Sequence, residues 1–260
     1  MARARLLVVA SPTLDLIDGS EPRPGGPGLY AAAAAALLGC ETEVLGPLGL
    51  DDAHLVAPAY EALGARLLGP WGPGCAARFS HRYTGLGRES RVECRPASLS
   101  PSSLDLAGPG YDAVLVSPVY CEVPPGLEAL AASLGSHAAV DLQGYARCGL
   151  GAPRLEGFSL VHLSVDDPLD PPEPPPAGVV AYTAGAEGGV LYHRGGREPL
   201  PSPRGLVEDP TGAGDAFTAL TLCMEALWGL DPVDAALQAA DLVADALTLA
   251  GEALRGLSEY

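Results

Sequence analysis

The sequence predicts an α/β protein with a mostly parallel central sheet, helices on both faces of it, and a small β lid. Short apolar runs, typical of buried strands, alternate along the chain with helix-like segments, which is the pattern of parallel strands joined by crossover helices. A polar hairpin pattern over residues 75–95, turning near residues 85–87, interrupts this alternation. We expect that hairpin to form the lid together with residues 14–24. The whole chain, residues 1–260, is predicted to be one such domain.

Each element follows from its local pattern. Residues 6–10 are a continuous apolar run, as expected for a strand buried on both faces. Glycines then open an alanine-rich helix that ends near Gly39. Further strands are expected at 42–45, 65–68, 113–116, 138–142, 160–163 and 179–183, followed by a hairpin at 190–200. Further helices are expected at 51–63, 126–134, 213–228 and 232–249, and a proline-rich link at 167–176.

Composition narrows the partners and the compartment. A formal net charge of −17 argues against nucleic acid or an anionic membrane as the main partner. The six cysteines form no C-x-x-C pair, which predicts buried free thiols in a reducing compartment and no disulfide framework. The longest apolar run, residues 29–38, is too short to cross a bilayer. We therefore expect a cytoplasmic protein.

The most informative segment is the nine residues 209–217, Asp-Pro-Thr-Gly-Ala-Gly-Asp-Ala-Phe. Its small residues let the backbone approach a bound group, and the helix that follows offers unpaired N–H donors to an anion. Asp215 would repel a bound phosphate, so its presence there makes sense if it accepts a proton beside that phosphate. The alternative is a simple helix cap, in which Thr211 or Asp215 bonds the first amides. The segment has no Walker lysine, and Phe217 stands where a dinucleotide fingerprint has its third glycine.

This segment resembles the C-terminal signature of the ribokinase-type (PfkB) carbohydrate kinases. The resemblance implies a ribokinase-like fold and the ATP-dependent transfer of a γ-phosphate to a hydroxyl of a small polyol (a sugar, an inositol-like compound or a nucleoside). It implies Asp215 as the general base, and Gly212, Ala213 and Gly214 as the anion hole. Mg²⁺ would arrive with the nucleotide, and a monovalent cation is a further candidate. The alternatives are a degenerate sensor that binds its ligands without turnover, and a vitamin-type kinase of the same superfamily.

Other segments match the same family in order along the chain. The residues implied on the substrate side are Asp15, Gly25, Gly26, Tyr30, Arg78, Asp141 and Gln143. Tyr30 occupies the place of the family's usual asparagine, which points away from ribose as the substrate. Arg147 is implied as a clamp on the transferring phosphoryl group, a role that suits a guanidinium. Without the resemblance, Asp15 is a turn residue and Arg147 a partner in a surface ion pair.

The residues implied on the nucleotide side are Ser164, Thr183, Gly185, Gly188, Thr211 and Gly251. Ser164 and Asp167 align with the family's Asn-x-x-Glu motif, and Asp167 keeps the carboxylate that a hard cation prefers. The alternative for these two residues is an ordinary polar loop. Five arginines crowd the predicted lid, where we interpret them mainly as charges that keep edge strands from aggregating. The alternative is that they capture an anionic or strongly polar substrate. A contact between two lids would give a homodimer.

Overall fold

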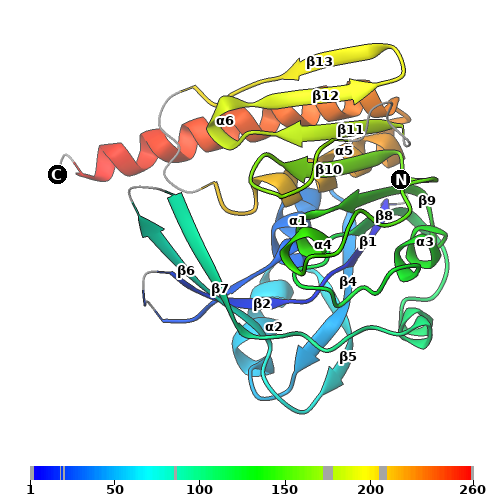
Figure 1. Ribbon diagram of the computed structural model, residues 1–260, viewed down its shortest axis with the longest axis vertical. Helices are drawn as coiled ribbons and strands as arrows, with labels where there is room; N and C mark the ends of the chain where they lie inside the picture. The colour runs from blue at the N-terminus through cyan, green and yellow to red at the C-terminus, as the bar shows by residue number, and fades with distance from the viewer. Residues whose placement is uncertain are drawn as a thin grey trace.

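The computed structural model describes residues 3–17, 19, 21–84, 87–171, 178–204 and 210–258, and for residues 83–84, 87–89 and 249–258 only the backbone. A nine-stranded sheet runs through the molecule in the order β13-β12-β11-β10-β9-β8-β1-β4-β5 (Figure 1). Its strands are β1 (Arg5–Val9), β4 (Glu41–Gly49), β5 (Arg66–Gly72), β8 (Tyr111–Val116), β9 (Gly135–Asp141), β10 (Leu160–Ser164), β11 (Val179–Thr183), β12 (Gly189–His193) and β13 (Gly196–Leu200). All pair in parallel except β12 and β13, which form an antiparallel hairpin at one edge.

A second, four-stranded sheet forms the lid. Its order is β3-β2-β6-β7, from β2 (Thr13–Ile17), β3 (Arg23–Gly25), β6 (Ala77–Thr84) and β7 (Gly87–Cys94). The predicted hairpin is thus confirmed, and β2 joins it by pairing in parallel with β6. The lid projects beside the carboxyl ends of the parallel strands (Figure 1). Phe79, together with Ala77 and Val119, is buried where the lid meets the loop after β8.

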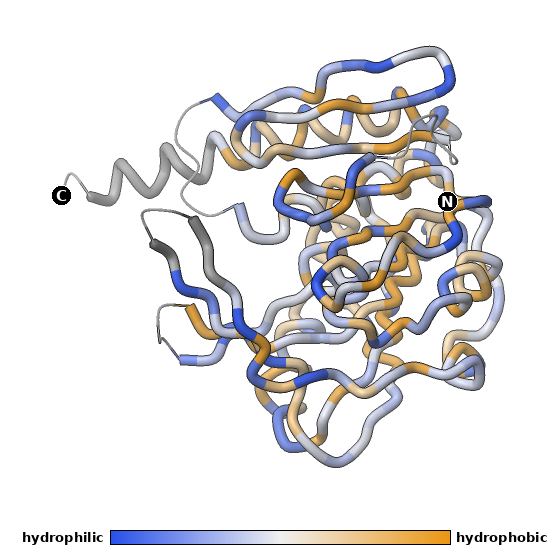
Figure 2. The backbone as a smooth tube through the Cα atoms, viewed as in Figure 1, coloured by the Kyte–Doolittle hydropathy of each residue, from blue (hydrophilic) through white to orange (hydrophobic). Residues whose placement is uncertain are grey.

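Helices cover both faces of the central sheet, as predicted. One face carries α1 (Pro27–Leu37), α2 (Ala53–Ala62), α5 (Ala213–Trp228) and α6 (Pro232–Ser258). The other carries α3 (Leu127–Ala132), α4 (Gln143–Arg147) and a 3₁₀ turn at Pro101–Leu106. Hydrophobic residues alternate between the two cores along β1, where Leu6 and Val8 face the first layer and Leu7 and Val9 the second. Hydrophobic residues are accordingly frequent along the central sheet and its helices, whereas the lid carries both hydrophilic and hydrophobic stretches (Figure 2).

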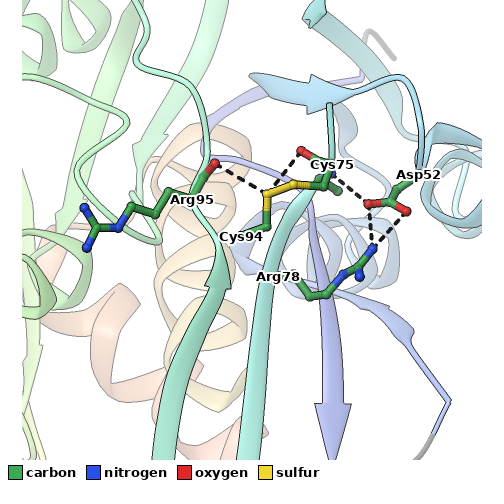
Figure 3. Close-up of a disulfide and its surroundings, with 6 residues drawn as sticks. Asp52, Cys75, Arg78, Cys94 and Arg95 are labelled. Atoms are coloured by element: carbon green, nitrogen blue, oxygen red, sulfur yellow. Dashed lines mark hydrogen bonds and ion pairs between the residues drawn. A yellow bond between two sulfur atoms is a disulfide. The ribbon is translucent and has the colours of Figure 1, made fainter. Parts of the chain in front are cut away.

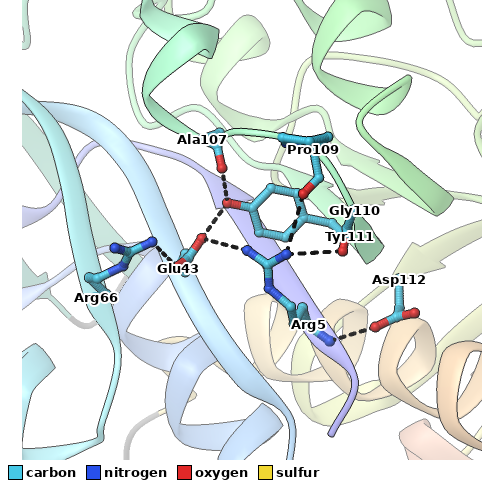
Figure 4. A network of polar contacts seen from close by, with 8 residues as sticks. All are labelled: Arg5, Glu43, Arg66, Ala107, Pro109, Gly110, Tyr111 and Asp112. Atoms are coloured by element: carbon cyan, nitrogen blue, oxygen red, sulfur yellow. Dashed lines mark hydrogen bonds and ion pairs between the residues drawn. The ribbon is translucent and has the colours of Figure 1, made fainter. Parts of the chain in front are cut away.

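A polar network ties the strands together at the end of the sheet away from the lid (Figure 4). The Arg5 guanidinium donates to Glu43 at 3.3 Å and to the carbonyl oxygen of Gly110 at 3.1 Å. Glu43 also accepts from Arg66 and from the hydroxyl of Tyr111. These contacts join β1, β4, β5 and β8, so the frame is stabilised at one end while the other is left for loops. Among the described helices, none is long and apolar enough to cross a membrane.

The cysteine prediction was wrong. Two disulfides are present, Cys75–Cys94 at the base of the lid and Cys121–Cys148 between the loop after β8 and the end of α4. Only Cys40 and Cys223 are free and buried, as predicted for all six. The absence of a C-x-x-C pair was misleading, because the bonded cysteines are 19 and 27 residues apart in sequence. They meet only through tertiary folding. Cysteine usage therefore no longer supports a reducing compartment, and the cytoplasmic location stays a prediction.

Candidate active site

A cleft of about 320 Å³ lies between the lid, the carboxyl ends of the parallel strands and the start of α5. This is the edge at which ligands bind in open α/β sheets, and the volume suits a small ligand. Residues from elements far apart in sequence meet there. Those predicted from the sequence that line it are Asp15, Gly26, Tyr30, Asp141, Gln143, Arg147, Ser164, Thr183, Gly185, Gly188, Thr211, Gly212, Ala213, Gly214 and Asp215.

The start of α5 lies at the centre of this cleft. Gly212 is the N-cap residue, with φ of 79°, a left-handed conformation that favours glycine. Within residues 210–258 no side chain caps the helix, so its first amides are not consumed by a cap of the usual kind. The N–H of Ala213 does donate to the carbonyl oxygen of Pro210 at 3.1 Å. The anion hole predicted at Gly212, Ala213 and Gly214 thus forms a turn at the cleft, with the amide of Ala213 already engaged.

Asp215 lies in the first turn of α5, and its environment favours the protonated form. Burial raises the pKa of Asp215 to about 7, and the nearby carboxylate of Asp141 acts in the same direction. His162, a hydrogen bond from the Ser117 hydroxyl at 3.3 Å, and Arg147 act in the opposite direction. A carboxyl group poised near neutral pH can accept a proton from an alcohol and release it again.

Two aromatic rings lie against the turn at the start of α5. A Cβ atom on Gly212 would lie 2.2 Å from the Tyr30 ring, and one on Gly214 would lie 2.6 Å from Cε1 of His162. Both positions therefore need glycine, since any side chain would displace a ring. The ring of Tyr30, which occupies the place of the family's usual asparagine, thus borders the turn.

One half of the cleft is built by the lid, and we call it the acceptor half because the sequence predicts substrate-side residues there. Asp15 in β2 accepts from the Thr13 hydroxyl at 3.0 Å, and its carboxylate lies 3.9 Å from Nε2 of His81 in β6. A Cβ on Gly25 would lie 2.2 Å from Oδ2 of Asp15, so glycine leaves room for that carboxylate. Phe79 stacks in parallel with His81, with their ring centroids 6.2 Å apart. This half therefore offers a carboxylate, an imidazole and an aromatic face to a polar ring.

The buried carboxylate of Glu122 holds the loop after β8 in place. Its Oε1 accepts from the amides of Ser11 and Val119 at 3.0 and 2.8 Å, and its Oε2 accepts from the amide of Tyr120 at 2.8 Å. Glu122 is 1% exposed, so these bonds are shielded from water. The loop that carries Ser117 to Asp215 is thereby fixed to the end of β1.

Arg147, at the end of α4, is tethered to this loop. Its guanidinium donates to the carbonyl oxygen of Val119 at 3.4 Å and lies 5.6 Å from the centre of the Phe79 ring. The next residue, Cys148, is disulfide-bonded to Cys121. Arg147 is therefore a cation that lines the cleft and is positioned from both sides, as a phosphoryl clamp would need to be.

We expect the double variant Cys121→Ser/Cys148→Ser to lose kcat several-fold, because Arg147 would lose its tether to the loop. Thermal unfolding should show a cost of about 2–4 kcal/mol in stability. The matched control is Cys75→Ser/Cys94→Ser, which removes the other disulfide and should lose similar stability while keeping kcat. Steady-state kinetics at saturating substrate concentrations would decide, and an equal loss of kcat in both variants would contradict the tether.

The other half of the cleft lies between the β11–β12 turn and α6, and we call it the donor half because the sequence predicts nucleotide-side residues there. Thr183 ends β11, and Gly185 and Gly188 form the turn that follows it. The α6 wall is apolar, lined by Ala240, Val243, Ala244 and Leu247. A flat base can lie against such a wall, with phosphates directed toward the start of α5. Gly251, predicted on this side, falls in α6, where the surroundings of side chains beyond residue 248 are not described.

Asp167, the predicted metal residue, lies outside the lining of the cleft, whereas its neighbour Asp166 is part of it. Asp167 accepts from the amide of Ser164 at 2.8 Å. Burial raises the pKa of Asp167, which favours its neutral form. In the part of the chain that is described, no group of three or more histidine, cysteine, aspartate or glutamate side chains is arranged to hold a metal ion. Of these two adjacent aspartates, Asp166 is the one whose side chain could approach a metal ion in the cleft.

Arg78 is not brought into the cleft. Its guanidinium donates to both carboxylate oxygens of Asp52, at 3.0 and 2.8 Å, beside the Cys75–Cys94 disulfide (Figure 3). Asp52 also accepts from the amide of Ala76 at 2.9 Å. Arg78 therefore joins the base of the lid to α2. Gly25 also lies outside the lining, where it makes room for Asp15.

Several lining residues were missed by the sequence analysis. They are Thr13, Phe79, His81, His162 and Asp166, together with Ser117, which contacts Asp215. Phe79 and His81 had a usable signal, since alternate residues of a strand share a face. His162 had no such signal, because it lies inside an apolar strand and its partner, Asp141, lies opposite it on the neighbouring strand.

The comparisons with known proteins point to one fold. The bifunctional protein HldE of Halorhodospira halophila is 30% identical over 262 residues, which covers 84% of this chain; the chain spans half the length of that relative. A sulfate-bound pyrophosphate-dependent kinase in the ribokinase family matches with a TM-score of 0.73 at 19% identity, over 92% of this chain and 94% of that chain. A nucleoside kinase of Burkholderia thailandensis with inosine matches with a TM-score of 0.69 at 20% identity, over 92% and 90%. No family model matches the chain.

These likenesses agree with the features already described. The parallel sheet, the lid on a short second sheet and the helix start that bears Asp215 occur here in the order that the sequence signature implied. The solved neighbours cover nearly the whole of this chain and nearly the whole of their own. The chain therefore has the fold of the ribokinase family.

Proposed function

We propose that this protein is a kinase that transfers the γ-phosphoryl group of ATP to a hydroxyl of a small polyol, such as a sugar, an inositol-like compound or a nucleoside. The observation that carries the proposal is the position of Asp215. Its carboxyl group lines the cleft from the first turn of α5, a helix start that no side chain within residues 210–258 caps. A base and an anion site side by side are what phosphoryl transfer to an alcohol requires.

In this mechanism the acceptor hydroxyl lies between Asp215 and the γ-phosphorus. Asp215 takes the hydroxyl proton as the oxygen bonds to phosphorus, while the bond to the β-phosphate oxygen breaks and ADP leaves. Amides at the start of α5 and the Arg147 guanidinium stabilise the charge on the transferring oxygens. Mg²⁺, bound with the donor, would offset further phosphate charge. The protein's part is positioning and electrostatics.

The choice of ATP rests on the apolar wall of α6. Val243 and Leu247 border the donor half, which suits a base better than a bare phosphate. One structural neighbour, however, is a pyrophosphate-dependent kinase. Inorganic pyrophosphate has no base that could pack against α6. Contact with the apolar side chains of α6 would therefore distinguish ATP from pyrophosphate as the donor.

The experiment is a matrix of donors and acceptors. ATP and pyrophosphate would each be offered with sugars, inositols and nucleosides, and phosphorylated product would be detected by mass spectrometry, with the Asp215→Asn protein as background. We expect product with ATP and at least one polyol. Product with pyrophosphate alone would overturn the donor, and ATP binding without any product would favour the sensor.

A further inference from the structure

A buried histidine at the centre of the cleft has no part in the mechanism above. His162 lies in β10 and is 5% exposed. Its Nδ1 lies 2.5 Å from Oδ2 of Asp141, and its Nε2 lies 3.1 Å from the hydroxyl oxygen of Thr183. Asp141 ends β9 beside the acceptor half, whereas Thr183 ends β11 on the donor half. One side chain therefore bridges the strands on which the two halves are built.

The same ring supports the start of α5. A Cβ on Gly214 would lie 2.6 Å from Cε1 of His162, so the backbone of the turn rests directly on the imidazole. The Phe217 ring, one turn further along α5, lies 5.8 Å from the His162 ring between centroids. Any movement of His162 would therefore displace the turn at the start of α5, which carries Asp215.

The charge of His162 is set by the groups that face it. Burial alone lowers the pKa of His162, but Asp141 on β9, Asp215 on α5 and Asp167 after β10 raise it, and the net change is upward. For Asp141, burial raises the pKa, yet the interactions with His162, the amide of Gln143 and Arg147 bring it below its usual value. Both directions favour the ionised form of the pair, an imidazolium beside a carboxylate. Both act on Asp215, Asp141 raising its pKa and His162 lowering it.

We propose that His162 is a positioning residue for Asp215 and the phosphate-binding turn, holding Gly214 from below and placing a buried positive charge beneath the site where phosphate oxygens gather. The inference deepens the proposed function and rests on it for its kinetic consequences. It assigns a role to the Asp141 carboxylate as well. Both oxygens of Asp141 are engaged, one by His162 and one by the amide of Gln143 at 2.8 Å, so Asp141 holds the imidazole in place in addition to its own effect on Asp215.

The kinetic test compares His162→Gln with a double variant. Glutamine removes the positive charge and leaves the Asp141 carboxylate uncompensated, which raises the pKa of Asp215. We therefore expect kcat/KM at pH 7 to fall about tenfold, and the acid limb of the pH profile, where kcat/KM rises as Asp215 ionises, to move to higher pH. His162→Gln/Asp141→Asn removes both charges, and the limb should return toward its wild-type position. A purely structural histidine would leave the limb unmoved in both variants, and that result would overturn the proposal. The matched control is His137→Gln, whose histidine pairs with Glu225 at the other end of α5 and should leave the profile unchanged.

A second readout needs no turnover. Nitrogen-15 NMR of the imidazole in the full-length protein reports the charge of His162 directly. We expect an imidazolium signal that persists above the usual histidine range and titrates at lower pH in Asp215→Asn, because one facing carboxylate has gone; the His137 signal should not move. A neutral His162 at pH 6, or no response to Asp215→Asn, would overturn the inference even in an active kinase. A responsive imidazolium in a protein without kinase activity would refute the proposed function alone.

Discussion

Asp215→Asn is expected to lower kcat by roughly 10²–10⁴-fold, the usual contribution of a positioned general base. Asparagine has nearly the shape of aspartate but cannot accept the hydroxyl proton, so binding should survive. Isothermal titration calorimetry with ATP should give a dissociation constant within a few-fold of wild type. A turnover number near the wild-type value would remove Asp215 from the mechanism, and a loss of ATP binding would show that the substitution damages the turn.

The pH dependence of the wild-type enzyme follows from the same residue. The pKa of Asp215 is about 7 in the folded protein, and a base works only when deprotonated, so kcat/KM should rise as pH increases through about 7. Ser117→Ala gives a graded test. The Ser117 hydroxyl donates to Asp215 and lowers its pKa. Without it, the rise should occur at higher pH while the plateau rate is largely kept.

Stability should change in the opposite sense to activity. The folded-state pKa of Asp215 is raised above its unfolded value of 3.8, so the folded protein binds the proton more tightly than the unfolded chain. Ionising Asp215 in the folded protein therefore lowers the free energy of unfolding. This cost is absent below pH about 4 and fully present above pH about 7. Asp215→Asn removes that cost, and its melting temperature at pH 8 should exceed that of wild type. The difference should shrink as pH falls toward 4.

Local sequence patterns predicted the frame of the fold and the chemical centre. The segment around Asp215 could be interpreted because a glycine turn and the first turn of a helix are contiguous, so their geometry depends little on the rest of the chain. The 75–95 hairpin could be interpreted for the same reason. By contrast, β3 is only three residues long and exists because β2 pairs with it, so it leaves no pattern of its own.

Long-range contacts explain what the sequence could not show. The sequence analysis named Asp167 as the metal candidate, but its carboxylate accepts a hydrogen bond from the amide of Ser164 and does not line the cleft, whereas the adjacent Asp166 does. Arg78 was a substrate candidate until the folded chain placed Asp52 beside it. Secondary-structure propensity does not predict such side-chain contacts, because each depends on where the fold places another segment of the chain.

Gly212→Ala is the second change for which we expect a large effect. The φ of 79° at this residue is strained for alanine, at a cost of about 1 kcal/mol. In addition, the new Cβ would lie 2.2 Å from the Tyr30 ring, so either the ring or the turn must move. Because the proposed mechanism uses amides of this turn to hold the phosphate oxygens, we expect kcat/KM to fall at least about 10²-fold.

A control at the other end of the same helix separates strain from displacement. Gly229 is the C-cap of α5, with φ of 64°, and a Cβ there would meet nothing within 4 Å. Gly229→Ala should therefore lose about 1 kcal/mol of unfolding free energy and keep full activity. If both alanine variants lose equal stability and neither loses activity, the turn at Gly212 does not bind phosphate. If Gly212→Ala alone is inactive and Gly212→Ala/Tyr30→Ala recovers part of its kcat/KM, displacement of the turn by the ring is the cause.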